Sequence, residues 1–158
     1  MKNGIYYIFL LYVALAAQAI FFTGIKPDLV LIIVCYYALK YGRTKGVFYG
    51  AFAGLLIDTV NGIILGPHML SKLLAGFFLK TVRGNLFQWN IYINTVSMVV
   101  FSFFNIVIVY MCLDFFSKIS LVNRTIGTSA VEILYTVLFS LVMYPFFKPE
   151  VEAAEHVR

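Results

Sequence analysis

The chain has 158 residues, of which 62% are hydrophobic and 12% are charged, and its formal net charge is +5 at pH 7. A soluble domain is about half apolar and about a quarter charged, so this composition excludes an ordinary soluble domain and predicts an integral membrane protein. Because a membrane span needs about 20 apolar residues, the length allows at most about six or seven crossings and leaves no room for a separate extramembrane domain.

Basic residues occur singly along the chain rather than in one block. Lys40, Arg43 and Lys45 flank one apolar run, and Lys80 and Arg83 flank another. This placement is typical of the cytoplasmic loops of a membrane protein, so we expect no binding of nucleic acid.

Apolar periodic runs predict an all-α fold, a single transmembrane helical domain that covers residues 1–158. The expected helices are approximately 5–23, 28–41, 46–60, 68–81, 91–113 and 126–147, followed by a short cytoplasmic tail, 148–158. Ala17-Gln18-Ala19 resembles a signal-peptide cleavage site, but the apolar run continues through Phe22 without a polar segment. We therefore favour an uncleaved first helix over a signal peptide.

The second helix is expected to start at Pro27 and Asp28. Proline is favoured at the first position of a helix, and a carboxylate there interacts well with the positive end of the helix dipole. Cys35, in this helix, and Cys112 lie in apolar runs without a CxxC motif. We expect both cysteines to be packing residues.

Glycine or aspartate recurs at every fourth residue in the third helix and beyond it. The positions are Gly46, Gly50, Gly54, Asp58, Gly62 and Gly66. A step of four residues drifts by about 40° around a helix, so the series keeps one face only as far as about Asp58. The helix should end there, because Asn61-Gly62 and Gly66-Pro67 provide turn chemistry.

The return helix repeats the spacing with His68, Lys72, Gly76 and Lys80. Small residues let membrane helices approach closely. We therefore expect the six glycines at 46, 50, 54, 62, 66 and 76 to pack against another helix or to bind a partner. Both helices are short for full spans, so a re-entrant pair remains an alternative.

The fifth helix is the longest apolar run, and its polar residues are expected to face other helices. They are Asn94, Ser97, Ser102 and Asn105. Trp89 and Tyr92 are placed as interfacial anchors at its start. The sixth helix contains Glu132 and should stop at Pro145 and Pro149.

Six spans place both termini on one side of the membrane. With cytoplasmic termini, eight basic residues lie inside and three outside, which agrees with the positive-inside rule. The inside set is Lys2, Lys40, Arg43, Lys45, Lys80, Arg83, Lys148 and Arg158, the outside set is Lys26, Lys118 and Arg124, and Lys72 is left out as intramembrane.

The chain resembles the rod shape-determining protein MreD family. The resemblance rests on Pro27-Asp28-Leu29, a basic loop, a GxxxGLLxD pattern from Gly50 to Asp58, then Gly62, Leu65-Gly66, and a return helix with Leu70 and Gly76. It implies a multi-pass protein of the bacterial cytoplasmic (inner) membrane that acts in peptidoglycan synthesis as a scaffold of the elongasome, the machinery that sets cell shape.

The partners implied by this resemblance are the scaffold MreC and, indirectly, the filament protein MreB, the glycosyltransferase RodA and the elongation transpeptidase, in contact with the lipid bilayer. The family is also distantly similar to the six-helix substrate-binding components of energy-coupling-factor transporters. The alternative function is therefore a small-solute-binding component of such a transporter.

Four residues are candidates for a buried polar site or cavity: Asp58, His68, Lys72 and Glu132. Asp58 either bonds to the free amides of the following turn or pairs with Lys72 or His68, because an unpaired charge inside a membrane is costly. Lys72 has the alternative of reaching an interface, and Glu132 of lying at one. The sequence has no GxSxG, HExxH or phosphate-loop motif, so we expect no enzyme, no metal and no cofactor.

Overall fold

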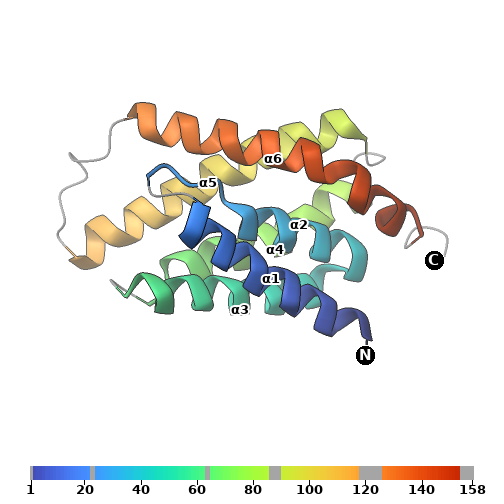
Figure 1. Ribbon diagram of the computed structural model, residues 1–158, viewed down its shortest axis with the longest axis horizontal. Helices are drawn as coiled ribbons and strands as arrows, with labels where there is room; N and C mark the ends of the chain where they lie inside the picture. The colour runs from blue at the N-terminus through green and yellow to red at the C-terminus, as the bar shows by residue number, and fades with distance from the viewer. Residues whose placement is uncertain (1, 22–23, 63–64, 86–89, 118–125, 154–158) are drawn as a thin grey trace.

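The computed structural model describes residues 2–21, 24–62, 65–85, 90–117 and 126–153, which form six α-helices and no strand. The helices are α1 (Lys2–Phe21), α2 (Leu29–Tyr41), α3 (Arg43–Asn61), α4 (Pro67–Asn85), α5 (Ile91–Ser117) and α6 (Ile126–Ala153). All six run roughly along the long axis of the bundle (Figure 1). The all-α class and the six helices are confirmed for this part of the chain.

Two helices are long and apolar enough to cross a membrane, judged by length and composition: α5 over Ile91–Cys112 and α6 over Gly127–Phe147. Shorter apolar segments lie in α1 and α2, at Ile5–Phe21 and Leu29–Tyr41. Large apolar side chains are exposed along α5 and α6, among them Phe103, Phe104, Leu138 and Phe146. Such continuous apolar exposure fits a lipid environment better than water. The number of crossings stays a prediction.

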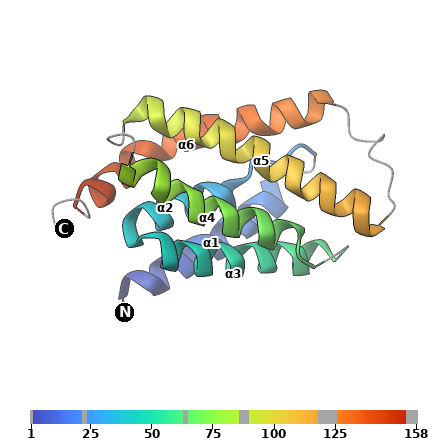
Figure 2. The same cartoon turned by 180° about the vertical axis from the view of Figure 1, so that it is seen from behind.

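Helix α2 lies at the centre of the bundle and packs against α1, α3, α4 and α6. It lies between α1, which is in front in Figure 1, and α4, which is in front in Figure 2. Ten of its 13 residues are buried, Cys35 among them. A helix that is covered on all sides needs no polar face, which explains why its sequence carries no charged residue from Leu29 to Leu39.

The regularly spaced glycines bring α3 close to α4 and to α2. A Cβ atom at Gly50 would lie 2.3 Å from the carbonyl oxygen of Lys72, and one at Gly54 would lie 2.3 Å from that of His68. A Cβ at Gly76 would lie 2.4 Å from the carbonyl oxygen of Gly46, whose own added Cβ would meet Ala38 of α2 at 2.6 Å. All four glycines therefore contact neighbouring helices of the same chain.

Gly62 and Gly66 do not pack against another helix in the described part of the chain, so the expected helix packing at these two positions is wrong, and partner binding there stays a prediction. Among the described residues, no heavy atom outside the adjacent backbone lies within 4 Å of a Cβ added at either position. Gly62 caps α3 with φ 66°, and its N–H donates to the carbonyl of Asp58 at 3.0 Å. Gly66 has φ 127°. Both are turn residues, because these backbone angles disfavour other amino acids.

Several helix boundaries differ from those expected from the sequence. Helix α6 continues through Pro145 and Pro149 to Ala153, so the expected stop at these prolines is wrong. A proline removes one backbone hydrogen bond, which kinks a helix without always ending it, and membrane helices often contain proline. Helices α3, α4 and α5 also extend beyond the expected ends by a few residues. The expected anchor Trp89 lies outside the described residues.

A substitution at Gly50 tests the close approach of α3 and α4. Gly50→Ala should lower the free energy of unfolding by about 1–3 kcal/mol, because the new methyl group meets backbone atoms that cannot move aside cheaply. This is the net loss that remains after the gain of about 1 kcal/mol that alanine brings as the better helix former. Thermal unfolding of the protein in detergent measures the effect, and Gly50→Leu should be worse.

Gly24→Ala is the matched control, because no described residue beyond its chain neighbours lies within 4 Å of a Cβ added there. It should unfold at the same temperature as the wild type. Equal stability of the Gly50→Leu protein and this control would contradict the packing role of the glycine.

Candidate functional site

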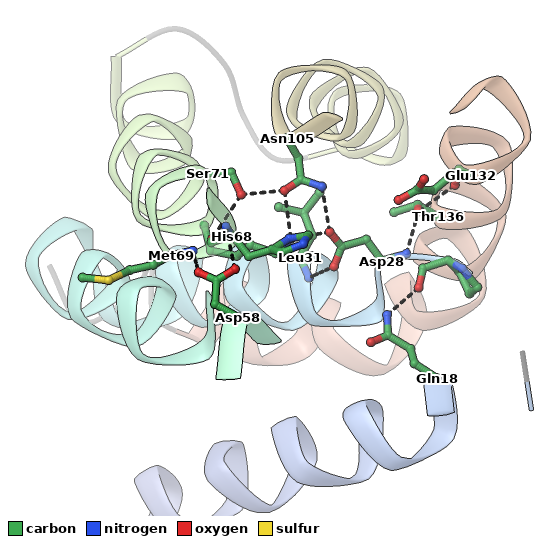
Figure 3. Close-up of polar contacts among 12 residues, drawn as sticks. Gln18, Asp28, Leu31, Asp58, His68, Met69, Ser71, Asn105, Glu132 and Thr136 are labelled. Atoms are coloured by element: carbon green, nitrogen blue, oxygen red, sulfur yellow. Dashed lines mark hydrogen bonds and ion pairs between the residues drawn. The ribbon is translucent and has the colours of Figure 1, made fainter. Parts of the chain in front are cut away.

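A cluster of polar side chains lies inside the bundle at the start of α2 (Figure 3). At about 1.5 Å per residue, the 13 residues of α2 span about 20 Å and the 27 residues of α5 span about 40 Å. The short α2 begins part of the way along the bundle (Figure 1). Its first turn is therefore surrounded by other helices, where each polar group needs a protein partner.

Asp28 caps the first turn of α2. Its Oδ1 accepts a hydrogen bond from the N–H of Leu31 at 2.9 Å, and its own N–H donates to the Thr136 hydroxyl of α6 at 2.9 Å. The expected helix start is thus observed at Asp28, although Pro27 precedes the cap and is not the first helical residue. The Pro27 carbonyl accepts a hydrogen bond from Gln18 of α1.

The second carboxylate oxygen of Asp28 forms an ion pair with Lys72 of α4, with 2.5 Å between Oδ2 and Nζ. Asn105 of α5 joins the pair, because its Nδ2 donates to Asp28 Oδ2 at 3.0 Å and its Oδ1 accepts from Lys72 Nζ at 2.9 Å. The Ser71 hydroxyl also donates to Asn105 Oδ1, at 2.6 Å. The side chains of α2, α4 and α5 thus form one network.

Burial makes this ion pair energetically important. The side chain of Lys72 is fully buried and that of Asp28 is 10% exposed. An isolated charge in such a place is costly, whereas a pair with further hydrogen bonds offsets most of that cost. The network therefore holds three helices together as long as both charges are present.

Asp58 does not pair with Lys72 or with the side chain of His68, so that expectation is wrong. Its carboxylate accepts three backbone hydrogen bonds, from the N–H groups of Gly66 at 2.9 Å, His68 at 3.1 Å and Met69 at 3.1 Å. These are the donors that the start of α4 leaves free. The alternative expectation, bonding to the amides of the following turn, describes this geometry.

Lys72 does not reach an interface either, because its ammonium group lies in the network around Asp28. It belongs to the second turn of α4, where the close contact with Gly50 directs the helix toward α2. Glu132 is partly buried on α6, one turn before Thr136, whose hydroxyl donates to its carbonyl at 2.8 Å. Figure 3 shows Glu132 on the α6 side of Asp28.

The polar residues of α5 face the interior as expected. Asn94, Ser97, Ser102 and Asn105 are all buried. Asn94 accepts a hydrogen bond from the Tyr36 hydroxyl at 3.1 Å and donates to Ser140 of α6 at 3.0 Å. A second network therefore connects α2, α5 and α6.

Ser71, Thr136 and Gln18 are members of the first network that the sequence did not single out. Each is a common polar residue that belongs to no motif. Only Thr136 could have been found from the sequence, because it follows Glu132 by four residues and therefore lies on the same helix face. Asn105 was expected to face other helices, but its bonds to Asp28 and Lys72 depend on tertiary packing.

The polar groups of the cluster bond mainly to other groups of the protein. Both charges of the pair bond to each other and to neutral donors and acceptors, and Asp58 is occupied by backbone amides. In the described part of the chain, no three His, Cys, Asp or Glu residues are grouped so that they could hold a metal ion. The cluster is therefore suited to fixing helices in place.

A double-mutant cycle tests the ion pair. Asp28→Asn and Lys72→Met should each lower the free energy of unfolding by about 3–5 kcal/mol, because each leaves one buried charge without its partner. The double variant should lose less than the sum of the two, and the comparison is made by thermal unfolding in detergent. Additive losses would contradict the pairing.

Two control experiments show whether the measured coupling is specific to the pair of Asp28 and Lys72. A cycle of Asp58→Asn with Lys72→Met should show a smaller coupling energy, since these side chains do not bond to each other. Asp114→Asn, at an exposed site on α5, should change stability by less than about 0.5 kcal/mol.

Comparison with known proteins gives one match. The family model described as rod shape-determining protein MreD matches residues 3–149, which include every residue of the polar cluster and of the glycine contacts. No curated protein and no solved structure matches the chain.

Proposed function

The chain belongs to the rod shape-determining protein MreD family, and on this premise we propose that it is a non-enzymatic membrane subunit of the bacterial cell-wall elongation machinery. In this proposal it binds and positions the scaffold MreC and, through it, the associated wall synthases. Family membership supports the role in rod-shape determination, and the choice of partners extends that role.

The buried polar cluster is the observation that supports a non-enzymatic role for this protein. Asp28, Lys72 and Asn105 use their polar groups on one another, so the bundle holds its charges internally. A solute-binding pocket would instead keep a few polar groups directed at the ligand. The cluster therefore supports a rigid scaffold over the alternative, a solute-binding component of an energy-coupling-factor-like transporter.

We place the partner contact on the outside of the bundle. The glycine face of α3, an obvious candidate for a partner helix, is covered by α2 and α4 of the same chain. The outer faces expose large apolar side chains, among them Phe48 and Phe52 of α3, Phe77 of α4 and Phe103 of α5. A membrane helix of MreC would pack there in place of lipid.

We also propose that both termini lie in the cytoplasm. The start of α1, the junction of α2 with α3, the end of α4 and the end of α6 all lie at one end of the bundle (Figures 1 and 2). Most basic residues of the sequence belong to these segments, which supports a cytoplasmic position for this end.

Reporter fusions test this topology. Fusions after Thr44 and after Gln88 should report a cytoplasmic position, and a fusion after Ile119 should report a periplasmic one, because six crossings alternate the sides. A cytoplasmic signal at Ile119 would overturn the six-span arrangement.

Pull-down from native membranes tests the partners. The tagged protein should retain MreC, and its depletion should make rod-shaped cells round, because the wall synthases would lose their positioning. Mass spectrometry of the purified sample identifies both proteins and bound small molecules, with an unrelated six-helix membrane protein as the control. A tightly held small solute without MreC would favour the transporter alternative.

A further inference from the structure

The apolar surface is shorter on one side of the bundle than on the other. Helix α3 packs against α2 and α4, and α5 packs against α4 and α6. In both views α3 lies along one edge of the bundle, and α5 and α6 lie along the opposite edge (Figures 1 and 2). Each edge exposes large apolar side chains, among them Phe48 and Phe52 on α3 and Phe103 and Phe104 on α5. In the membrane placement proposed above, these side chains face lipid.

On α5, exposed polar residues mark both ends of the apolar surface. Asn90 directly precedes the helix and Asp114 lies near its end, and both are exposed. At about 1.5 Å per residue, the two positions are about 36 Å apart along the helix. A hydrocarbon layer is about 30 Å thick, so α5 can cross it fully, and a tilt of the helix takes up the excess.

On α3, the corresponding length is smaller. Thr44 and Asn61 are the exposed polar residues at its two ends, and about 26 Å of helix separates them. Unlike lysine, these side chains are too short to reach a distant headgroup layer. Helix α1 is similar, because its apolar segment Ile5–Phe21 has a length of about 26 Å. The Tyr49 hydroxyl of α3 donates to the Tyr7 carbonyl of α1 at 2.7 Å, so the two short apolar surfaces are neighbours.

The turn after α3 is unsuited to the hydrocarbon layer. Asn61 and Gly62 are exposed, and no described residue beyond the chain neighbours lies within 4 Å of a Cβ added at Gly62. The last carbonyl groups of a helix lack partners within it, and lipid-exposed irregular backbone does not occur where no water can bond to it. This turn therefore needs water or headgroups, although residues 63–65 of the sequence are apolar.

The other end of α3 needs polar surroundings as well, because Arg43 and Thr44 are exposed at the junction with α2. Moving the protein along the membrane normal would place one end of α3 outside the hydrocarbon only by drawing the other end inside. A tilt of the helix shortens its projected length further. Both ends of α3 can therefore reach polar surroundings together only where the hydrocarbon layer is thinner than about 30 Å.

We propose that the side of the bundle formed by α1 and α3 thins the bilayer around it, to a hydrocarbon thickness of about 26 Å or less. Lipids with short or disordered acyl chains fit this side, whereas the side formed by α5 and α6 fits a layer of ordinary thickness. The proposal rests on the membrane placement given above and not on the choice of protein partner.

Spin labels test the thickness at α3. Thr44→Cys, Phe52→Cys and Asn61→Cys are labelled one at a time in purified protein in dioleoylphosphatidylcholine bilayers. Oxygen concentrates in hydrocarbon and a soluble nickel complex in water, so the ratio of their accessibilities reports the surroundings of each label. Nickel should dominate at Thr44 and Asn61, and oxygen at Phe52. The parent protein carries Cys112→Ala and keeps Cys35, which is fully buried.

Matched labels on α5 are the control. Val96→Cys and Met111→Cys are at exposed positions about 22 Å apart along the helix, and oxygen should dominate at both, because the layer keeps its ordinary thickness there. Oxygen dominance at Thr44 or Asn61 would overturn the proposal, since one end of α3 would then lie inside the hydrocarbon. Low accessibility to both reagents at Asn61 would also overturn it, because a second copy of the chain would then cover the turn.

Two further readouts keep the result separate from folding and from the proposed function. Circular dichroism and gel filtration should show that the labelled variants retain their helices and size. Nickel dominance at Phe52, Val96 and Met111 would overturn the membrane placement together with this inference. The expected pattern of labels supports the thinning whether or not MreC is retained in the pull-down, so a missing partner would overturn only the scaffold role.

Discussion

The start of α2 inside an apolar bundle is the constraint on which the arrangement of the other helices depends. A helix that begins there exposes free N–H groups and a carboxylate where water is not available to bond them. The Asp28 carboxylate provides for both. One of its oxygens accepts a hydrogen bond from a free N–H of the first turn, and the other forms an ion pair with Lys72. The remaining groups of this turn bond to Gln18, Thr136 and Asn105, so one turn fixes α2 relative to α1, α4, α5 and α6.

The two buried carboxylates are stabilised in different ways, and the glycine contacts connect them. Asp58 is compensated by backbone amides at the start of α4, whereas Asp28 needs the ammonium of Lys72. Gly54 touches the backbone at His68, beside those amides, and Gly50 touches the carbonyl of Lys72. Because α3 can approach α4 only where Cβ atoms are missing, the small residues of α3 set the position of α4 that both carboxylates require.

The sequence predicted those features that depend on local pattern. Helix number, the apolar runs, the polar residues of α5 that face inward and the packing of Gly50 and Gly54 all follow from spacing within one helix or hairpin. The partner of Lys72 could not be predicted in this way. Asp58 is nearer in the chain, but α2 lies at the centre of the bundle, so Asp28 is nearer in space. The passage of α6 through Pro145 and Pro149 was also missed, since a proline weakens a helix locally while packing elsewhere can maintain it.

The two ends of the bundle differ in how far their charged side chains are buried. In the half that contains Asp28 and Asp58, these two carboxylates and Lys72 are buried and bonded within the chain, so they contribute to holding the helices. At the opposite end, Arg43 and Lys45 are exposed and lie beside aromatic rings. Because the buried charges are bonded to other groups of the chain, few of them remain to bind another molecule. Contacts with other molecules would then be made at the outer surface of the bundle.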